Sequence, residues 1–306
     1  MGGPGTGGAM DVTLGGSPAG DLFGQRKSKM FGTERRAVGA SIVSTALVIG
    51  GFVALFLLAP GSAQVRHSYF DLRDMRQAFV GDPPHGIFSV GQAILVNIEM
   101  FAIAEVLVLV VGLGLALVRQ SRSPVLFPFR IVATAYVDFF RGVPLILVIY
   151  AVGFGAPTLG LRVISTQSAF VYGTASLVLA YSAYVSEVYR AGLHSVPLGQ
   201  VAAARSLGLR PRTALRHVVL PQALRTIIPP LLNDFIGLQK DTALVAVLGT
   251  VIEVNRAAGI AAGTQFNYSA YTVAAILFLI LTIPLARFTD HLIAKDRDRR
   301  LAGAMP

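Results

Sequence analysis

The chain has 306 residues, of which 54% are hydrophobic and 14% are charged, and its mean hydropathy is +0.64. Soluble domains usually carry about 25% charged residues, so this composition excludes an ordinary soluble protein and indicates one that crosses a membrane. The net charge of +10 does not indicate nucleic-acid binding, because the basic residues cluster between apolar runs and at the chain ends, while the absence of cysteine excludes disulfides and zinc–thiolate sites.

Residues 1–36 are rich in glycine and then basic, which predicts a disordered cytoplasmic tail. Six runs beyond it can cross a membrane if about 20 apolar residues make one span. They are 37–59 (an additional N-terminal helix), 88–118, 129–154, 168–189, 220–251 and 271–286, the last extending to 292. Residues 60–87 are expected to form an extracytoplasmic segment, and residues 293–306 a second cytoplasmic tail.

The distribution of Lys and Arg determines the expected orientation. With the N-terminus in the cytoplasm, 20 of these residues lie on the cytoplasmic side and 5 on the other, with Lys240 at membrane depth. Cytoplasmic loops of membrane proteins carry such an excess of Lys and Arg. We therefore expect an all-α membrane protein with about six transmembrane helices and both termini in the cytoplasm.

The second expected span contains polar side chains at Asn97, Glu99 and Glu105. Asn97 or Glu99 could reach a polar cavity, or it could form a hydrogen bond between packed helices. Glu99 and Glu105 are six residues apart on a helix, so they cannot both line one narrow face. Both explanations stay open at this point.

A basic loop follows the fourth span, since there are six Arg and no acidic residue between Glu187 and Asp234. Glu187 is expected to form a local ion pair with Arg190. Pro197 and the alanine run after it favour a short helix of small residues, which Gly208 would end. A helix with an alanine face can enter a groove on another protein closely, although an ordinary basic loop explains the same residues equally well.

The fifth span carries a polar stripe. Pro229-Pro230 is expected to interrupt the helix, because proline lacks the N–H that a helix needs. Beyond the two prolines, residues at helical spacing fall on one face: Asn233, Asp234, Gly237, Lys240 and Asp241. A charged side chain at the bilayer centre costs roughly 2.5–3.5 kcal/mol. Either the acids pair with Lys240 or a neighbouring subunit, or the stripe lines a cavity where Asp meets the ammonium and Lys the carboxylate of a zwitterionic substrate.

No constellation for catalysis is visible in the sequence. A phosphate-binding Gly-x-x-x-x-Gly-Lys-Ser/Thr pattern and a His-Glu-x-x-His pattern are both absent, and the five His are scattered. We therefore expect a transport subunit rather than an enzyme, with no catalytic or metal-binding residues. Any ATP would be hydrolysed by a partner.

The basic loop also follows a fixed register: Ala203-Ala204, then Gly208, then Val218-Val219-Leu220-Pro221. This register resembles the coupling loop of ABC importer permeases, whose pattern is Glu-Ala-Ala, three residues, Gly, nine residues and Ile-x-Leu-Pro. The leading Glu of that pattern is Ala202 here. Further segments resemble the polar amino-acid branch (histidine, glutamate, glutamine and arginine importers) in the same order along residues 88–290: they are 138–145, 184–192, 220–230 and 233–244.

The resemblance implies the type I ABC importer permease fold, with a core over residues 88–292 that includes a coupling loop at 190–221. It implies that the loop docks on a cytoplasmic ATPase through Gln200, Ala202, Ala203, Ala204, Arg205, Gly208, Leu209, Leu220 and Pro221. It favours a translocation role for Asn233, Asp234, Lys240, Asp241 and Thr242, with Asn97 and Glu99 as further candidates. Asp234 stands where the family usually has Glu, which leaves the substrate's side chain open.

The resemblance also implies an ATP-driven importer for polar amino acids (glutamate, glutamine or basic amino acids) as a multi-pass protein of the bacterial inner membrane. Its expected partners are a second permease chain, related but not identical because Ala202 lacks the anionic anchor, two ATP-binding cassette subunits, an extracytoplasmic amino-acid-binding protein and membrane lipid, without nucleic acid. No cofactor is expected on this chain, since ATP and Mg would lie on the partner ATPase. The alternative is an ion-coupled secondary transporter or channel that uses Asp234, Lys240 and Asp241 as a relay.

Overall fold

A computed structural model describes the backbone of residues 19–303 and the side chains of residues 38–295. Within this range the regular elements are helices, together with an isolated bridge between Asp82 and Ile87. The all-α class is therefore confirmed. The chain divides into two units, residues 1–64 and residues 65–306, and each is described by itself.

The helices differ widely in length, because long apolar runs alternate with short connecting turns. In chain order the α-helices are α1 (Ala19–Leu58), α2 (Ser62–Tyr69), α3 (Leu72–Val80), α4 (Val90–Gln120), α5 (Phe127–Gly142), α6 (Leu145–Tyr150), α7 (Arg162–Ser165), α8 (Ala169–His194), α9 (Leu198–Ser206), α10 (Pro211–Ala214), α11 (Leu220–Asp241), α12 (Val254–Gln265) and α13 (Ser269–Gly303). A 3₁₀ segment, η6 (Thr242–Leu248), follows α11 directly.

In the first unit, α1 contains an apolar stretch, Val38–Leu58, that is long enough to cross a membrane. This stretch agrees with the expected span at 37–59. The helix itself begins at Ala19, so residues 19–36 are helical where we expected a disordered tail. Residues 1–18 of that expected tail lie outside the described residues.

In the second unit, three further helices pass the same test of length and apolarity: α4, α8 and the Ser269–Lys295 part of α13. The expected span at 129–154 is not one straight helix. It consists of Pro124–Gly142 and Leu145–Leu159, which meet at 112°. The bend falls at Val143-Pro144, because a residue before proline disfavours the helical region and Val143 is extended (ψ 131°).

The fifth expected span also differs from the prediction. We expected Pro229-Pro230 to interrupt it, but α11 continues through both prolines to Asp241. Proline's fixed φ near −65° fits a helix, so these residues remove two N–H donors without ending the helix. Because of its polar stripe, α11 is not among the helices of the described residues that are apolar enough to count as spans.

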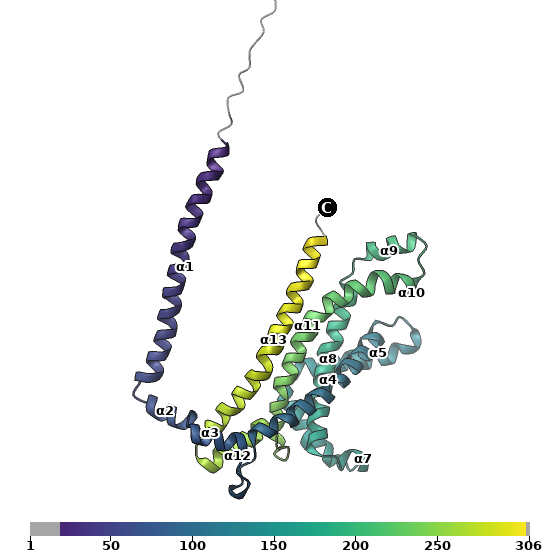
Figure 1. Cartoon of the computed structure of the whole chain (residues 1–306). Coiled ribbons are helices and arrows are strands. Elements are labelled where there is room, and N and C mark those ends of the chain that lie inside the picture. Colours follow the sequence, from purple (N-terminus) through teal and green to yellow (C-terminus); the bar gives the residue numbers. More distant parts are fainter. Residues whose placement is uncertain (1–18, 304–306) are drawn as a thin grey trace, which may run out of the picture. The chain divides into compact units, whose positions relative to one another are not determined.

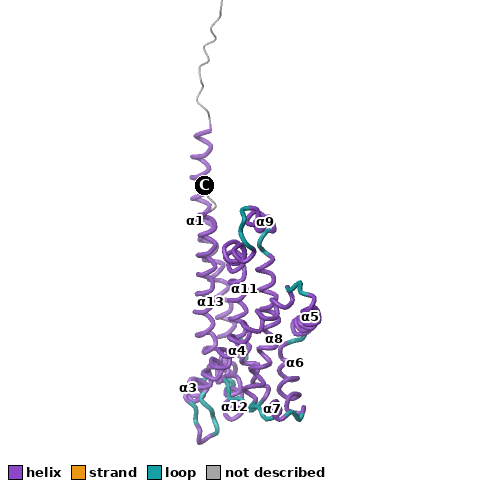
Figure 2. Tube along the Cα trace, turned by 90° about the vertical axis from the view of Figure 1, so that its right-hand side faces the viewer, coloured by secondary structure: helices purple, strands orange, loops and turns teal. Residues whose placement is uncertain are grey.

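Helix α8 forms the centre of the second unit and packs against α4, α5 and α11. A cluster of buried residues joins α4, α8 and α11, with Met100 from α4, Leu177 from α8 and Leu238 from α11. Gly112 of α4 allows the close approach, since a Cβ there would lie 2.8 Å from Cγ1 of Val185. Figures 1 and 2 both place α9 at one end of this unit and α3, α7 and α12 at the other.

Candidate translocation site and coupling loop

The bend between α5 and α6 adjoins a small cavity of about 190 Å³. Its walls come from three parts of the chain: the bend, α8 and α11. The principal lining residues are Phe140, Val143, Tyr181, Tyr184, Asp234 and Asp241. The two acids are seven residues apart on α11, and the two tyrosines are three apart on α8, so each pair shares one helix face.

The two carboxylates of the cavity have different partners. Asp241 accepts a hydrogen bond from the hydroxyl of Tyr181 at 2.7 Å. Gly237 leaves room for that ring, because a Cβ there would lie 3.0 Å from the tyrosine oxygen. Asp234 has a buried Oδ2 with no hydrogen-bond partner among the described residues. A buried carboxylate oxygen without a donor is costly, so this site has an unmet need for a hydrogen-bond donor or a cation.

The rest of the polar stripe faces elsewhere. Asn233 and Lys240 are exposed, and neither is among the cavity's lining residues. Within residues 38–295 no ion pair joins Lys240 to Asp234 or Asp241. The stripe is therefore divided: Asp234 and Asp241, seven residues apart, line the cavity, whereas Lys240, six residues from Asp234 and next to Asp241, lies outside its lining.

Asn97 belongs to a buried network rather than to the cavity. Its Nδ2 donates to Thr242 Oγ1 at 3.0 Å and to Glu253 Oε2 at 3.1 Å, while its Oδ1 accepts from the N–H of Val254. Asn97 is 1% exposed, and Thr242 and Glu253 are 0% exposed. The geometry thus favours the packing role for Asn97 and extends it to Thr242, both of which we had placed in the translocation set.

The two glutamates of α4 also lie outside the cavity lining. Glu99 is exposed and Glu105 is half-buried. Glu253, by contrast, has a structural role that we did not predict. It caps the N-terminus of α12 by accepting hydrogen bonds from the N–H groups of Asn255 and Arg256.

The basic loop folds as two short helices, α9 and α10, the first of which was expected. Gly208 ends α9 in the left-handed region (φ 82°), and the next N–H, of Leu209, returns to the carbonyl of Ala204. Ala204 is buried, whereas Ala202 and Arg205 are exposed. The outer face of α9 is therefore exposed and carries small side chains such as Ala202. Leu198 and Leu207 are exposed at its two ends (85% and 84%).

The same loop is tied to the start of α11. Gln222 donates from Nε2 to Oε1 of Gln200 at 2.6 Å. Leu220 and Pro221 lie at the exposed start of α11. Of the residues that we assigned to ATPase coupling, Gln200 and Ala204 thus hold α9 in place, and the remainder lie mostly on its surface.

Comparisons with known proteins agree on one family. Residues 109–297 match the family described as binding-protein-dependent transport system inner membrane component. The chain is 36% identical over 183 residues to the probable glutamine ABC transporter permease protein GlnM of Bacillus subtilis, covering 60% of this chain and 82% of that one. It is 33% identical over 210 residues to the putative glutamine transport system permease protein GlnP of Rickettsia typhi, covering 68% and 93%. A crystal structure of an amino acid ABC transporter with histidines is similar at a TM-score of 0.61 and 29% identity, covering 67% and 93%.

The chain belongs to this family of ABC transporter permeases. Membership confirms the resemblance that the coupling-loop register predicted. It makes the chain a membrane subunit for amino-acid transport rather than an enzyme, and a multi-pass protein of the bacterial inner membrane.

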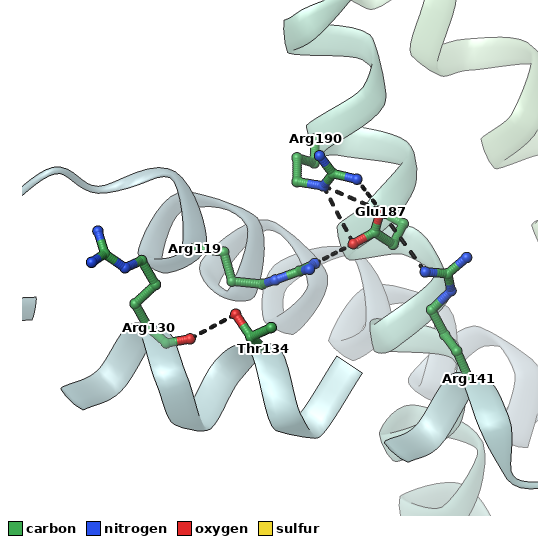
Figure 3. Close-up of polar contacts among 6 residues, drawn as sticks. All are labelled: Arg119, Arg130, Thr134, Arg141, Glu187 and Arg190. Carbon is green, nitrogen blue, oxygen red and sulfur yellow. Dashed lines mark hydrogen bonds and ion pairs between the residues drawn. The ribbon is translucent and has the colours of Figure 1, made fainter. Parts of the chain in front are cut away.

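The permease also has an ion-pair cluster around Glu187, shown in Figure 3. Arg190 donates to it from Nε and Nη2, the latter at 2.7 Å, which confirms the expected local pair. Arg119, at the end of α4, donates from Nη1 to the other carboxylate oxygen. Arg141 lies farther away, with Nη1 at 3.9 Å. One carboxylate near the coupling loop therefore links the ends of α4, α5 and α8.

Two of the residues that organise these sites were not predicted, namely Tyr181 and Arg119. Tyr181 stands three residues before Tyr184, just outside the segment 184–192 that we used for its family resemblance. Arg119 follows an apolar span, where a basic residue is commonplace. Neither has a local pattern that reveals its partner, because Asp241 and Glu187 lie 60 and 68 residues away in the chain.

Proposed function

We propose that this permease translocates polar amino acids through the cavity between the α5–α6 bend, α8 and α11. The observation that supports the proposal is Asp234, whose buried Oδ2 lies in a cavity wall and has no hydrogen-bond donor among residues 38–295. An amino-acid ammonium supplies three N–H donors and a positive charge, which is what this carboxylate lacks.

The cavity's charge indicates a substrate class. Asp234 and Asp241 are its charged lining residues, and no Lys or Arg of residues 38–295 lines it. Two carboxylates disfavour a substrate with a negatively charged side chain, because like charges in a partly buried site repel strongly. We therefore favour glutamine or a basic amino acid over glutamate, and the glutamine named in the relatives GlnM and GlnP supports the first of these.

Transport would be driven by a partner. The exposed alanine face of α9 suits docking on an ATP-binding cassette subunit, where ATP and Mg would lie, and family membership supports partners of this kind. A second permease chain, a second cassette subunit and an extracytoplasmic binding protein would complete the importer. Because Ala202 replaces the family's Glu, we propose that the second permease chain is not identical.

The test is uptake of radiolabelled amino acids by the assembled transporter in proteoliposomes. Asp234→Asn should lower glutamine or arginine uptake at least about tenfold while assembly survives, since a charge-assisted bond to the ammonium is lost. Glu99→Gln is the matched control, because Glu99 is an exposed acid outside the cavity. Normal uptake by Asp234→Asn would show that the residue is structural. Uptake without ATP that follows an ion gradient would establish the secondary-transporter alternative instead.

A further inference from the structure

A second and larger cavity, of about 490 Å³, lies where the end of α4, the exposed side of α5 and the last turns of α8 meet. Its principal lining residues are Arg119, Arg130, Ile131, Thr134, Asp138 and Arg190. None of them lines the translocation cavity, so this arginine cavity is a separate site.

Positive charge exceeds negative charge in the arginine cavity. Three Arg and one Asp line it, and Glu187 is the one further acid that pairs with its arginines within residues 38–295. Arg119 donates to Glu187 through Nη1 alone, and Arg190 through Nε and Nη2. Each guanidinium has five N–H groups, so both keep donors that the carboxylate does not take.

Arg130 is independent of this carboxylate. Figure 3 shows its guanidinium directed away from Glu187, while Arg119 and Arg190 converge on that residue. Its Nη1 donates to the carbonyl oxygen of Ser121 at 2.9 Å, and its guanidinium lies 5.1 Å from the centre of the Phe127 ring. These two contacts hold a positive charge at the cavity without neutralising it.

The arginine cavity lies near the ends of apolar helices, at the level expected for lipid headgroups. Arg119 lies in the last turn of the apolar helix α4, and Arg190 lies in the last turns of α8, so both mark where an apolar helix ends. Beside them, α5 exposes large apolar side chains, including Ile131 (53%) and Val132 (68%). A dissolved anion needs only the arginines, whereas a phospholipid also needs an apolar wall for its acyl chains.

We propose that the arginine cavity binds the phosphate of an anionic phospholipid, with the acyl chains along the exposed apolar side of α5. Guanidinium groups bind phosphate oxygens in pairs of N–H bonds, and basic pockets between membrane helices bind anionic headgroups. Asp138 opposes the phosphate, and it has no hydrogen bond or ion pair among the described residues, so it limits the affinity. The site shares Arg119 and Arg190 with the Glu187 cluster, and a bound lipid would therefore stabilise the ends of α4, α5 and α8.

The experiment measures phosphatidylglycerol binding to the full-length permease, purified with its partners and stripped of lipid, by native mass spectrometry. Arg130→Gln should weaken binding about tenfold, because one charged donor is removed. Asp138→Asn should strengthen it about threefold, because an opposing charge is removed. Arg122→Gln is the matched control, since Arg122 is an exposed arginine on the connection between α4 and α5 and does not line the cavity. Phosphatidylcholine should bind weakly to every variant.

Opposite shifts in the two cavity variants, with Arg122→Gln unchanged, support the proposal. Because the two shifts have opposite signs, impaired folding cannot imitate them. Equal loss in Arg122→Gln and Arg130→Gln, or no shift in either cavity variant, would overturn the proposal in favour of general surface attraction. A further arm titrates inorganic phosphate: if millimolar phosphate displaces the lipid completely, the site takes a soluble anion and the lipid proposal is wrong.

Discussion

The hydroxyl of Tyr181 donates a hydrogen bond to Oδ2 of Asp241 at 2.7 Å, whereas Oδ2 of Asp234 on the same cavity wall has no donor in the described part of the chain. Two carboxylates of one cavity therefore differ in what they need. Asp241 already accepts a hydrogen bond, while Asp234 remains available to a donor group that enters the cavity.

Tyr181→Phe should remove the donor of Asp241 and leave a half-buried carboxylate unsatisfied. We expect the transporter to lose about 1–3 kcal/mol of stability. Uptake should also fall, because Asp241 would compete with Asp234 for the substrate's donors. Thermal unfolding in detergent and uptake in proteoliposomes check this. Tyr184→Phe is the control, since its hydroxyl makes only a 3.5 Å contact with the Arg141 carbonyl; equal effects in both variants would contradict the prediction.

Asn97→Ala should act on stability rather than on substrate affinity. It removes the donor to Thr242 and Glu253 and the acceptor of the Val254 N–H, all in a buried setting. We expect a loss of about 2–3 kcal/mol, measured by thermal unfolding. Asn233→Ala, at an exposed position, should change stability by less than about 0.5 kcal/mol. A stable Asn97→Ala protein with weakened substrate affinity would return Asn97 to the translocation set.

Glu187→Gln should leave Arg119 and Arg190 facing each other without the carboxylate that both bind. We expect a stability loss of about 2–3 kcal/mol, because removing one member of a largely buried ion pair strands the other charges. Arg141→Gln should cost less than about 1 kcal/mol, since that side chain is 45% exposed and lies 3.9 Å from the carboxylate. Thermal unfolding compares the two variants. A larger loss of stability in Arg141→Gln would show that Glu187 is not the central residue of the cluster.

Ala202→Glu should be tolerated, because residue 202 is exposed on α9. If a non-identical partner permease supplies the main anionic anchor, transport should change by less than about twofold, as expected for one added exposed charge. The measurement is uptake together with substrate-stimulated ATP hydrolysis. A large gain in either would mean that the coupling loop of this chain limits transport.

Much of the fold could be predicted from apolar run lengths and a few marked positions. Pro197 marked the start of α9 because proline fixes φ, and Gly208 marked its end because glycine accepts a positive φ. The register from Gly208 to Pro221 came from the resemblance to the family pattern. The bend at Val143-Pro144 had the same kind of local signal, although we expected one continuous span. Pro229-Pro230 carried the same signal and did not break α11, since φ of proline is compatible with a helix.

The candidate site was less predictable, because it depends on which helix lies opposite each face. Helical spacing grouped Lys240 with Asp234, but α8 packs so that only the acids face the cavity. In the same way, the amide of Asn97 was visible in the sequence, but its partner Glu253 lies 156 residues further on. Residue spacing along one helix shows which side chains share a face, but it does not show which helix packs against that face.

The close contacts of α8 have a mechanical consequence. Near its start, a Cβ on Gly173 would collide with Val245, and near its end, a Cβ on Gly192 would collide with Ile227. Between these points, Val185 of α8 lies so close to Gly112 of α4 that a Cβ on this glycine would collide with it. Helix α8 is thus held by close packing near both ends and in between, which leaves the helix little room to slide or tilt. A displacement of α9 would therefore be transmitted along α8 as a rigid element to Tyr181, which lines the cavity.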